Sequence, residues 1–270
     1  MYLIQLHRAR LVCFLLTYHV IASSTNCPTS PLFLRLSNCT AAHTTVDSWG
    51  VKFSISTPPQ YVCLVPSTVL NSTLVIDSKF CANNANLTTA QCESLCGNTF
   101  DTSTPGTAFK SAPNTVLAPN PVWADISPEE LNAGNVLLQW PPDQHLSDYP
   151  IGIITSGENH NVGHLGLANN SEFLQSALAA NLTTRNGFGL DAGSQSVANP
   201  RPGGLVLGGY DLSRIDGVVS RFQTDASARG RECPLLVTVS QLVLRFPTDR
   251  GPSDIKLVTP GTAISACVEP

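Results

Sequence analysis

The alternation of apolar and polar residues along the chain predicts many short β-strands. Val51, Phe53 and Ile55 alternate with Lys52 and Ser54, which is the two-residue period of a strand with one buried face. Apolar segments bounded by Gly and Pro predict further strands at residues 61–65, 73–78, 203–209 and 235–246, with 255–258 as the hairpin partner of the last.

Helix signals are few, and the helices that they predict are short. Thr88 and Gln91 form a capping box for a helix that ends near Gly97, and a similar signal predicts one to two turns at residues 127–134. A longer helix begins after Ser171, with Phe173, Leu174, Ala177 and Leu178 on one face. Many short strands and few helices predict an all-β fold, with irregular segments at residues 25–47 and 102–121.

The N-terminus predicts export from the cell. Basic residues up to Arg10 precede an apolar run at residues 11–22, and small residues follow to Ser24. This order is typical of a cleaved signal peptide, here residues 1–24, and the run is shorter than the ~20 residues that span a bilayer. A membrane anchor is the weaker alternative. With no retention tetrapeptide at the end, we expect a secreted, extracellular protein without membrane association after cleavage.

The composition agrees with an exported glycoprotein. Charged residues make up 13% of the chain and the net charge is −4, with no basic patch, so nucleic acid is not an expected partner. Sequons of the form Asn-X-Ser/Thr predict N-glycosylation at surface positions. They begin at Asn38, Asn71, Asn86, Asn169 and Asn181.

The cysteines predict a disulfide-bonded chain. Cys13 lies in the signal, and the other eight of the nine cysteines form an even set, as expected in an oxidising compartment. Cys233 and Cys267 stand far from the rest and are expected to pair with each other. The pairing among Cys27, Cys39, Cys63, Cys81, Cys92 and Cys96 stays open.

No metal ion or cofactor is expected from the sequence. Cys92 and Cys96 have a possible ligand spacing but lack a matching second pair. His160 and His164 are four residues apart without a metalloprotease motif, and they are predicted to be solvated loop residues. No phosphate-binding glycine loop is present.

Four segments, in order along the chain, resemble the pepsin family of aspartic proteases. Residues 51–60, ending Thr-Pro-Pro-Gln, are similar to the family's opening strand and Gly-Thr-Pro-Pro-Gln turn. Residues 100–109 are similar to its Phe-Asp-Pro-Ser…Thr-Phe element, and residues 163–178 to its Gly-Ile-Leu-Gly-Leu strand and helix. Residues 204–211 match its Gly-X-Leu-X-Leu-Gly-Gly-X-Asp hairpin almost letter for letter.

The resemblance implies a fold of two β lobes with a cleft between them. Residues 48–230 would form a pepsin-like N-terminal lobe with a few short helices. Residues 231–270 would be the incomplete start of a truncated second lobe. The strands at residues 235–246 and 255–258 would then either cover the sheet of the first lobe or leave apolar surface exposed.

The resemblance also implies where the catalytic residues should be. The mechanism needs two neighbouring carboxylates that share one proton. Counting on from Gln60, the family's Asp-Thr-Gly turn falls on Ser67, Thr68 and Val69, and the second aspartate position falls beyond Pro270. A hydroxyl is no base near neutral or acidic pH, so no catalytic residue is assigned.

Other candidate residues are given structural roles. Residues 191–193, Asp-Ala-Gly, lie just before the hairpin at residues 204–211 and are predicted to be a hairpin loop. Ser67 lacks the surroundings of a nucleophile, and no clear flap tyrosine exists, with Trp123 interpreted as a core aromatic.

The leading hypothesis is therefore a secreted pepsin-like protein without catalytic activity, either a pseudoenzyme or a truncated remnant, with a peptide or protein as a possible ligand of a residual groove. The alternatives are an active acid endopeptidase and a structural or cell-surface glycoprotein. The sequence does not indicate an oligomeric state.

Overall fold

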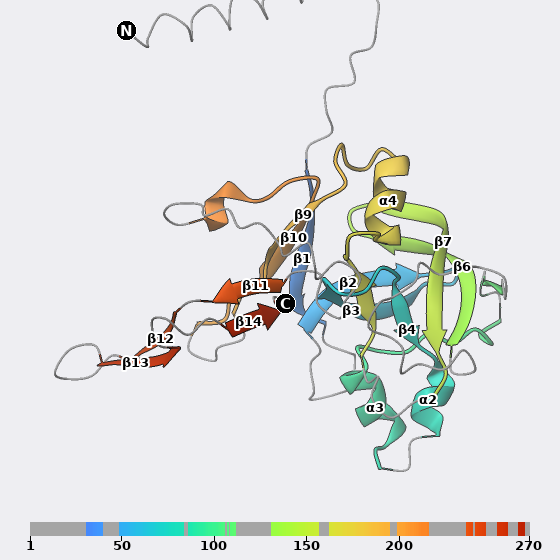
Figure 1. Ribbon diagram of the computed structural model, residues 1–270. Coiled ribbons are helices and arrows are strands. Elements are labelled where there is room, and N and C mark those ends of the chain that lie inside the picture. Colours follow the sequence, from blue (N-terminus) through green and yellow to red (C-terminus); the bar gives the residue numbers. More distant parts are fainter. Residues whose placement is uncertain are drawn as a thin grey trace, which may run out of the picture. The chain divides into compact units, whose positions relative to one another are not determined.

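A computed structural model of the chain describes residues 31–39, 49–83, 86–105, 107, 109–111, 131–156, 162–194, 199–215, 236–239, 241–246, 253–258 and 264–267 (Figure 1). The predicted signal peptide, Cys27, Trp123, His160 and Cys233 lie outside these residues.

Most of the described chain forms one large β-sheet. Ten strands pair in the order β5-β6-β7-β4-β8-β3-β2-β1-β10-β9. Because β6 also pairs with β2, the six strands β2, β3, β8, β4, β7 and β6 close into a barrel. The strands are β1 (Leu32–Asn38), β2 (Trp49–Ile55), β3 (Gln60–Ser67), β4 (Leu74–Ile76), β5 (Lys110–Ser111), β6 (Leu131–Trp140), β7 (Gln144–Ile154), β8 (His164–Gly166), β9 (Phe188–Asp191) and β10 (Gly203–Leu207).

The helices are short, so the predicted all-β class with a few short helices is confirmed. The described helices are α2 (Ser78–Ala82), α3 (Thr89–Leu95), α4 (Glu172–Ala179) and the 3₁₀ turn η2 (Leu212–Arg214). The capping box of α3 is present as predicted, with the Thr88 hydroxyl accepting from the Gln91 N–H. In α4, Phe173, Leu174 and Ala177 are buried as predicted, but Leu178 is exposed.

Strands with clear local alternation lie where the sequence predicts them. Val51, Phe53 and Ile55 of β2 are buried while Lys52 is exposed. The predicted hairpin forms between β12 (Leu242–Phe246) and β13 (Ser253–Val258). The single strand predicted at 235–246 is wrong, because its first part is a separate strand at residues 236–239 that pairs in another sheet. Two side chains of β13, Ile255 and Leu257, are exposed. Of the two outcomes expected for these strands, this one is the exposure of apolar surface.

Four further predictions about secondary structure are wrong. Residues 25–47 are not wholly irregular, because β1 lies within them. The predicted strand at 73–78 ends early, since Asp77 caps α2. The predicted loop at 102–121 includes β5. Of the helix expected at 127–134, the described residues 131–134 lie in β6 instead. Every second residue of β6 is buried over 134–140, so strand alternation outweighs the capping signal.

Strands β7 and β14 (Ile264–Cys267) have no counterpart in the sequence prediction. β7 is the barrel partner of β6, and β14 pairs with β11 (Leu236–Val239) in a separate two-stranded sheet.

Four aromatic rings join the barrel to α4. Phe173 of α4 meets Phe53 of β2 and Trp140 of β6 at centroid distances of 5.8 Å, and Tyr149 of β7 at 6.2 Å, all edge-on. Such contacts add about 0.5–1.5 kcal/mol per pair beyond the area that they bury. Phe173 is therefore the aromatic centre of the contact between α4 and the barrel, to which the buried Leu174 and Ala177 also contribute.

We expect Phe173→Ala to lower the free energy of unfolding by about 3–5 kcal/mol, because it removes the ring at the centre of this cluster. Leu178→Ala, on the exposed side of the same helix, should change it by less than about 1 kcal/mol. Urea unfolding of both variants measures the difference, and equal effects would contradict the assigned role of Phe173.

A second prediction concerns Ser56, which has a φ of 67° and is 0% exposed, with an Oγ that has no hydrogen-bond partner among the described residues. Left-handed backbone costs a residue with a Cβ about 1–2 kcal/mol. We expect Ser56→Gly to stabilise the chain by about 1 kcal/mol.

The control is Ser54→Gly. Ser54 also has an Oγ without a partner, but it lies in regular strand β2, where glycine destabilises by about 0.5–1 kcal/mol. If the free energy of unfolding changes with the same sign in both variants, backbone strain at Ser56 is not the cause of the change in stability.

Candidate functional site

The segment expected to hold the first catalytic residue lies between β3 and β4. β8 is inserted between these two strands in the sheet, parallel to β3 and antiparallel to β4. Ser67 is the last residue of β3 and lies level with Gly166 of β8. The chain must therefore cross the end of β8 as it passes from Ser67 to Leu74.

Backbone hydrogen bonds fix this crossing segment. The Leu167 N–H donates to the Ser67 carbonyl at 2.8 Å, and the Ala168 N–H donates to the Leu70 carbonyl at 2.9 Å. The Glu172 N–H, at the start of α4, donates to the Asn71 carbonyl at 3.0 Å. The segment is thus held by the strand and the helix that it crosses.

Gly166 is required by this close approach. A Cβ at Gly166 would lie 2.6 Å from the Ser72 carbonyl oxygen and 2.7 Å from the carbonyl carbon of Asn71. No side chain fits against backbone at that distance, so the glycine permits β8 to pass beneath the segment.

The three residues that the resemblance aligns with the Asp-Thr-Gly turn are buried. Ser67 is 1% exposed, Thr68 5% and Val69 6%. The Val69 side chain belongs to an apolar cluster with Leu70 and Leu74, which gives it a packing role. The motif offers hydroxyl groups and backbone amides, which can donate and accept hydrogen bonds but cannot act as an acid and base pair.

Two of the segments that carry the resemblance are hydrogen-bonded to each other. Gln60 accepts from the Asp101 N–H at 2.8 Å, and its Nε2 donates to the Asp101 carbonyl at 2.9 Å and to Thr107 Oγ1 at 3.2 Å. Asp101 in turn accepts from the hydroxyl and N–H of Ser103, which lowers the pKa of its carboxyl. The Gln60 turn and the 100–107 loop therefore form one structural unit.

Asp191 has a structural environment that agrees with the predicted hairpin loop. It ends β9, which pairs with β10, and it accepts from the Gly193 N–H. Its carboxylate lies 3.0 Å from the Arg201 guanidinium and 3.2 Å from that of Arg214. The two guanidinium groups thus neutralise the charge of this carboxylate.

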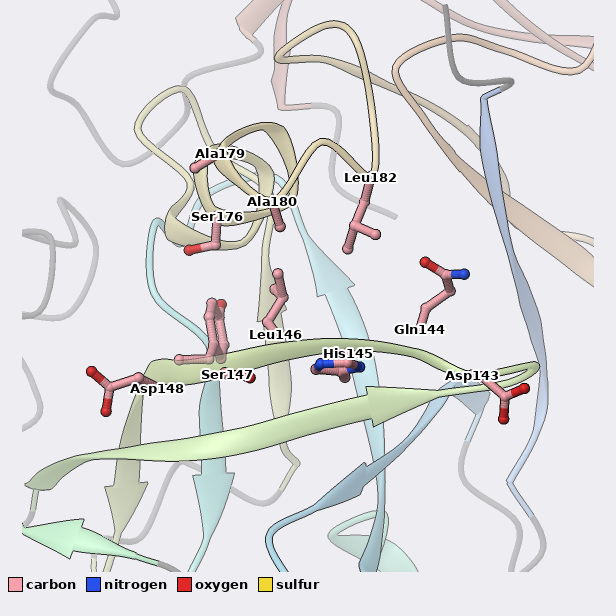
Figure 2. Close-up of a pocket in the computed structure, with 11 residues that line it drawn as sticks. Asp143, Gln144, His145, Leu146, Ser147, Asp148, Ser176, Ala179, Ala180 and Leu182 are labelled. Atoms are coloured by element: carbon pink, nitrogen blue, oxygen red, sulfur yellow. The ribbon is translucent and has the colours of Figure 1, made fainter. Parts of the chain in front are cut away.

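A cavity with a volume of about 530 Å³ lies between β7 and α4 (Figure 2). Asp143 and Asp148 stand at opposite ends of its β7 wall, with His145 between them (Figure 2). The two side chains stand apart in this view, so they do not form a pair of carboxyl groups that could share a proton. The cavity has no acid pair for peptide hydrolysis.

A second cavity, of about 380 Å³, lies beside β9 and β10. Its wall includes the ion-paired Asp191 and Arg214, and the exposed side chains of Phe33 and Tyr210 border it. The charges here are already paired with each other, so nothing in this cavity marks a particular ligand.

The structure decides part of the cysteine pairing that the sequence left open. Cys39 is bonded to Cys63, and Cys81 to Cys92. Cys96 is a free, buried thiol, and burial together with the nearby Glu93 raises its pKa to about 11. The predicted pair of Cys233 and Cys267 is untested, because Cys233 lies outside the described residues.

The fold adds a residue that sequence spacing missed. The sequence considered Cys92 and Cys96 as a pair, but Cys81 joins them, and their three sulfurs lie within 4.8 Å of one another. Cys81 comes from another helix, so no local motif contains it. Of the two histidines considered, His164 is a partly buried residue of β8 rather than a loop residue.

Four of the five predicted glycosylation sites are exposed, but Asn71 is buried. Asn38, Asn86, Asn169 and Asn181 lie at the surface. Asn71 is 5% exposed, and its Oδ1 accepts from the Asn170 N–H at 3.1 Å. The expectation that every sequon is at the surface is therefore wrong, because the crossing segment packs Asn71 against the start of α4.

Comparison with known proteins adds no relative. No protein-family model matches the chain, and no curated protein matches it. Within the described ranges, no helix combines the length and apolar character that crossing a membrane requires.

We predict that Asn71 carries no glycan in the folded, secreted protein, because a sugar on its amide would hold the crossing segment open. Enzymatic glycan removal in heavy-oxygen water, followed by peptide mass spectrometry, marks each occupied asparagine. Asn169, exposed on the neighbouring turn, is the matched control. A marked Asn71 in correctly folded protein would contradict the packing of this segment.

Proposed function

We propose that the chain is a secreted, pepsin-like glycoprotein that does not hydrolyse peptide bonds. The observation that carries the proposal is Ser67, which ends β3 in the position that the resemblance gives to the first catalytic aspartate. It is buried in a segment fixed by β8 and α4.

The arrangement of the similar segments supports the assignment. The Gln60 turn is bonded to the 100–107 loop, and the strand at 164–166 runs beside Ser67 before leading into α4. The segment at 204–211 includes β10, which pairs with both β1 and β9. Gln60 and Ser67 are the two ends of β3, the strand at 164–166 pairs with β3, and β10 lies in the same sheet, so the similar segments belong to one folded unit.

The chemistry at Ser67 supports the lack of hydrolysis. An aspartic protease activates water with one ionised carboxylate while its protonated partner polarises the scissile carbonyl. A serine hydroxyl, with an intrinsic pKa far above neutral, cannot take the water proton. Val69, which belongs to the apolar cluster, stands where the resemblance expects a glycine.

Export and glycosylation rest on separate features. The two disulfides are compatible with an oxidising compartment, and four of the five sequons are exposed. Sugar on this surface would add solubility to a chain in which only 13% of residues are charged.

The test uses the full-length chain secreted from a eukaryotic host and a denatured protein substrate at pH 3–5. We expect no cleavage that a statine-type peptide inhibits, with Ser67→Ala as a control that removes the Ser67 hydroxyl. Inhibitor-sensitive cleavage that withstands purification to homogeneity would refute the proposal.

Binding of the same inhibitor distinguishes two forms of the proposal. Calorimetric binding without cleavage would indicate a retained peptide groove, and absence of binding would indicate a structural glycoprotein.

A further inference from the structure

Three sulfur atoms meet in one buried cluster. The Cys96 Sγ lies 3.7 Å from the Cys81 Sγ and 3.8 Å from the Cys92 Sγ, while Cys81 and Cys92 are bonded to each other. Each of the three residues is 1% exposed. The free thiol is therefore in contact with both sulfurs of an existing disulfide.

The positions of the three cysteines in the fold explain why they meet. Cys81 lies in α2, Cys92 lies in α3, and Cys96 is the C-cap of α3, one turn after Cys92. Residues four apart on a helix lie on the same face, so Cys92 and Cys96 both face α2. Helices α2 and α3 lie beyond the end of β4 (Figure 1).

We propose that Cys96 is an alternative disulfide partner of Cys81, so that the link between α2 and α3 can pass from Cys81–Cys92 to Cys81–Cys96. The Cys96 thiolate attacks the Cys81 sulfur, the Cys81–Cys96 bond forms, and the Cys81–Cys92 bond breaks. Cys92 leaves as a thiolate and takes up the proton that Cys96 gave up. The exchange is redox-neutral and needs no other reactant.

Either pairing keeps the same two elements connected. The loop closed by the bond has a sequence separation of 11 for Cys81–Cys92 and 15 for Cys81–Cys96. Since loop-closure entropy depends only on the logarithm of loop length, the two bonds constrain the unfolded chain to a similar degree. A Cys92–Cys96 bond would instead lie within one helical turn and leave α2 unattached.

Burial makes the exchange internal and slow. The cluster lies among apolar residues, and external thiols cannot reach it while the chain is folded. The raised pKa of Cys96 keeps its thiol protonated near neutral pH, and the thiolate is the attacking form. The folded chain therefore holds mainly the Cys81–Cys92 bond and exchanges slowly with a minor Cys81–Cys96 form, which becomes the main link when Cys92 is lost.

The test is to remove Cys92 and locate the remaining bond. Cys92→Ser, Cys96→Ser and the double variant are secreted under oxidising conditions, unfolded in an alkylating agent without reductant, and mapped by mass spectrometry. We expect a Cys81–Cys96 peptide in Cys92→Ser. Its Tm should stay within a few degrees of the wild type, and that of the double variant should be about 5–10 °C lower.

Alkylation of both Cys81 and Cys96 in Cys92→Ser, with the Tm of the double variant, would overturn the proposal. So would recovery of three free thiols and a stoichiometric metal ion from the wild type, since the cluster would then be a thiolate metal site. If Cys92→Ser is not secreted, the proposal is tested on the wild-type protein instead.

In that case, native protein is held at 37 °C, quenched in acid and mapped. A minor Cys81–Cys96 peptide, missing from Cys96→Ser, is the expected result. Its absence from the wild type would overturn the proposal. The measurement is independent of the proposed function, because it does not depend on a substrate or a cleft.

Discussion

The insertion of β8 between β3 and β4 is the constraint on which the rest of this fold depends. It forces the chain to cross from one side of β8 to the other after Ser67, and the crossing is possible because Gly166 has no side chain. The carbonyls of Ser67, Leu70 and Asn71 then find their donors on the residues that follow β8. The same hydrogen bonds pair the backbone of the crossing segment and hold it against β8 and α4, so the segment has little freedom to change its conformation.

The same constraint explains why two residues of the segment, Asn71 and Val69, have roles that their local sequence does not suggest. Asn71 has the local signature of a glycosylation site, yet its amide oxygen is needed to bind the Asn170 N–H. Val69 stands where the resemblance expects a flexible glycine, yet it fills space beside Leu70 and Leu74. In both cases tertiary packing sets the role of the residue, and a local motif is a poor guide to it.

The sequence predicts those features that depend on neighbouring residues. The alternation in β2, the capping box at Thr88 and the Ser171 cap of α4 are all local, and all are found in the structure. Closure of the barrel by β2 and β6 and the approach of Cys81 to Cys96 join distant segments, so no spacing rule could reveal them. For the candidate site, counting from Gln60 gave Ser67 but not its burial, because burial depends on where β8 lies.

Packing around Ser67 also bears on how readily a carboxylate could occupy this position. An aspartate there would place a carboxyl group at a position that is 1% exposed, and burial favours the protonated form of a carboxyl and costs folding free energy unless hydrogen bonds compensate. A second carboxylate would be needed to share the proton, and backbone freedom at Val69 would be needed to aim the first. Restoring that freedom with glycine would remove a side chain from the apolar cluster that surrounds the three cysteines. Catalysis at this position therefore requires several coupled changes, and those at Ser67 and Val69 each act against the packing of this buried segment.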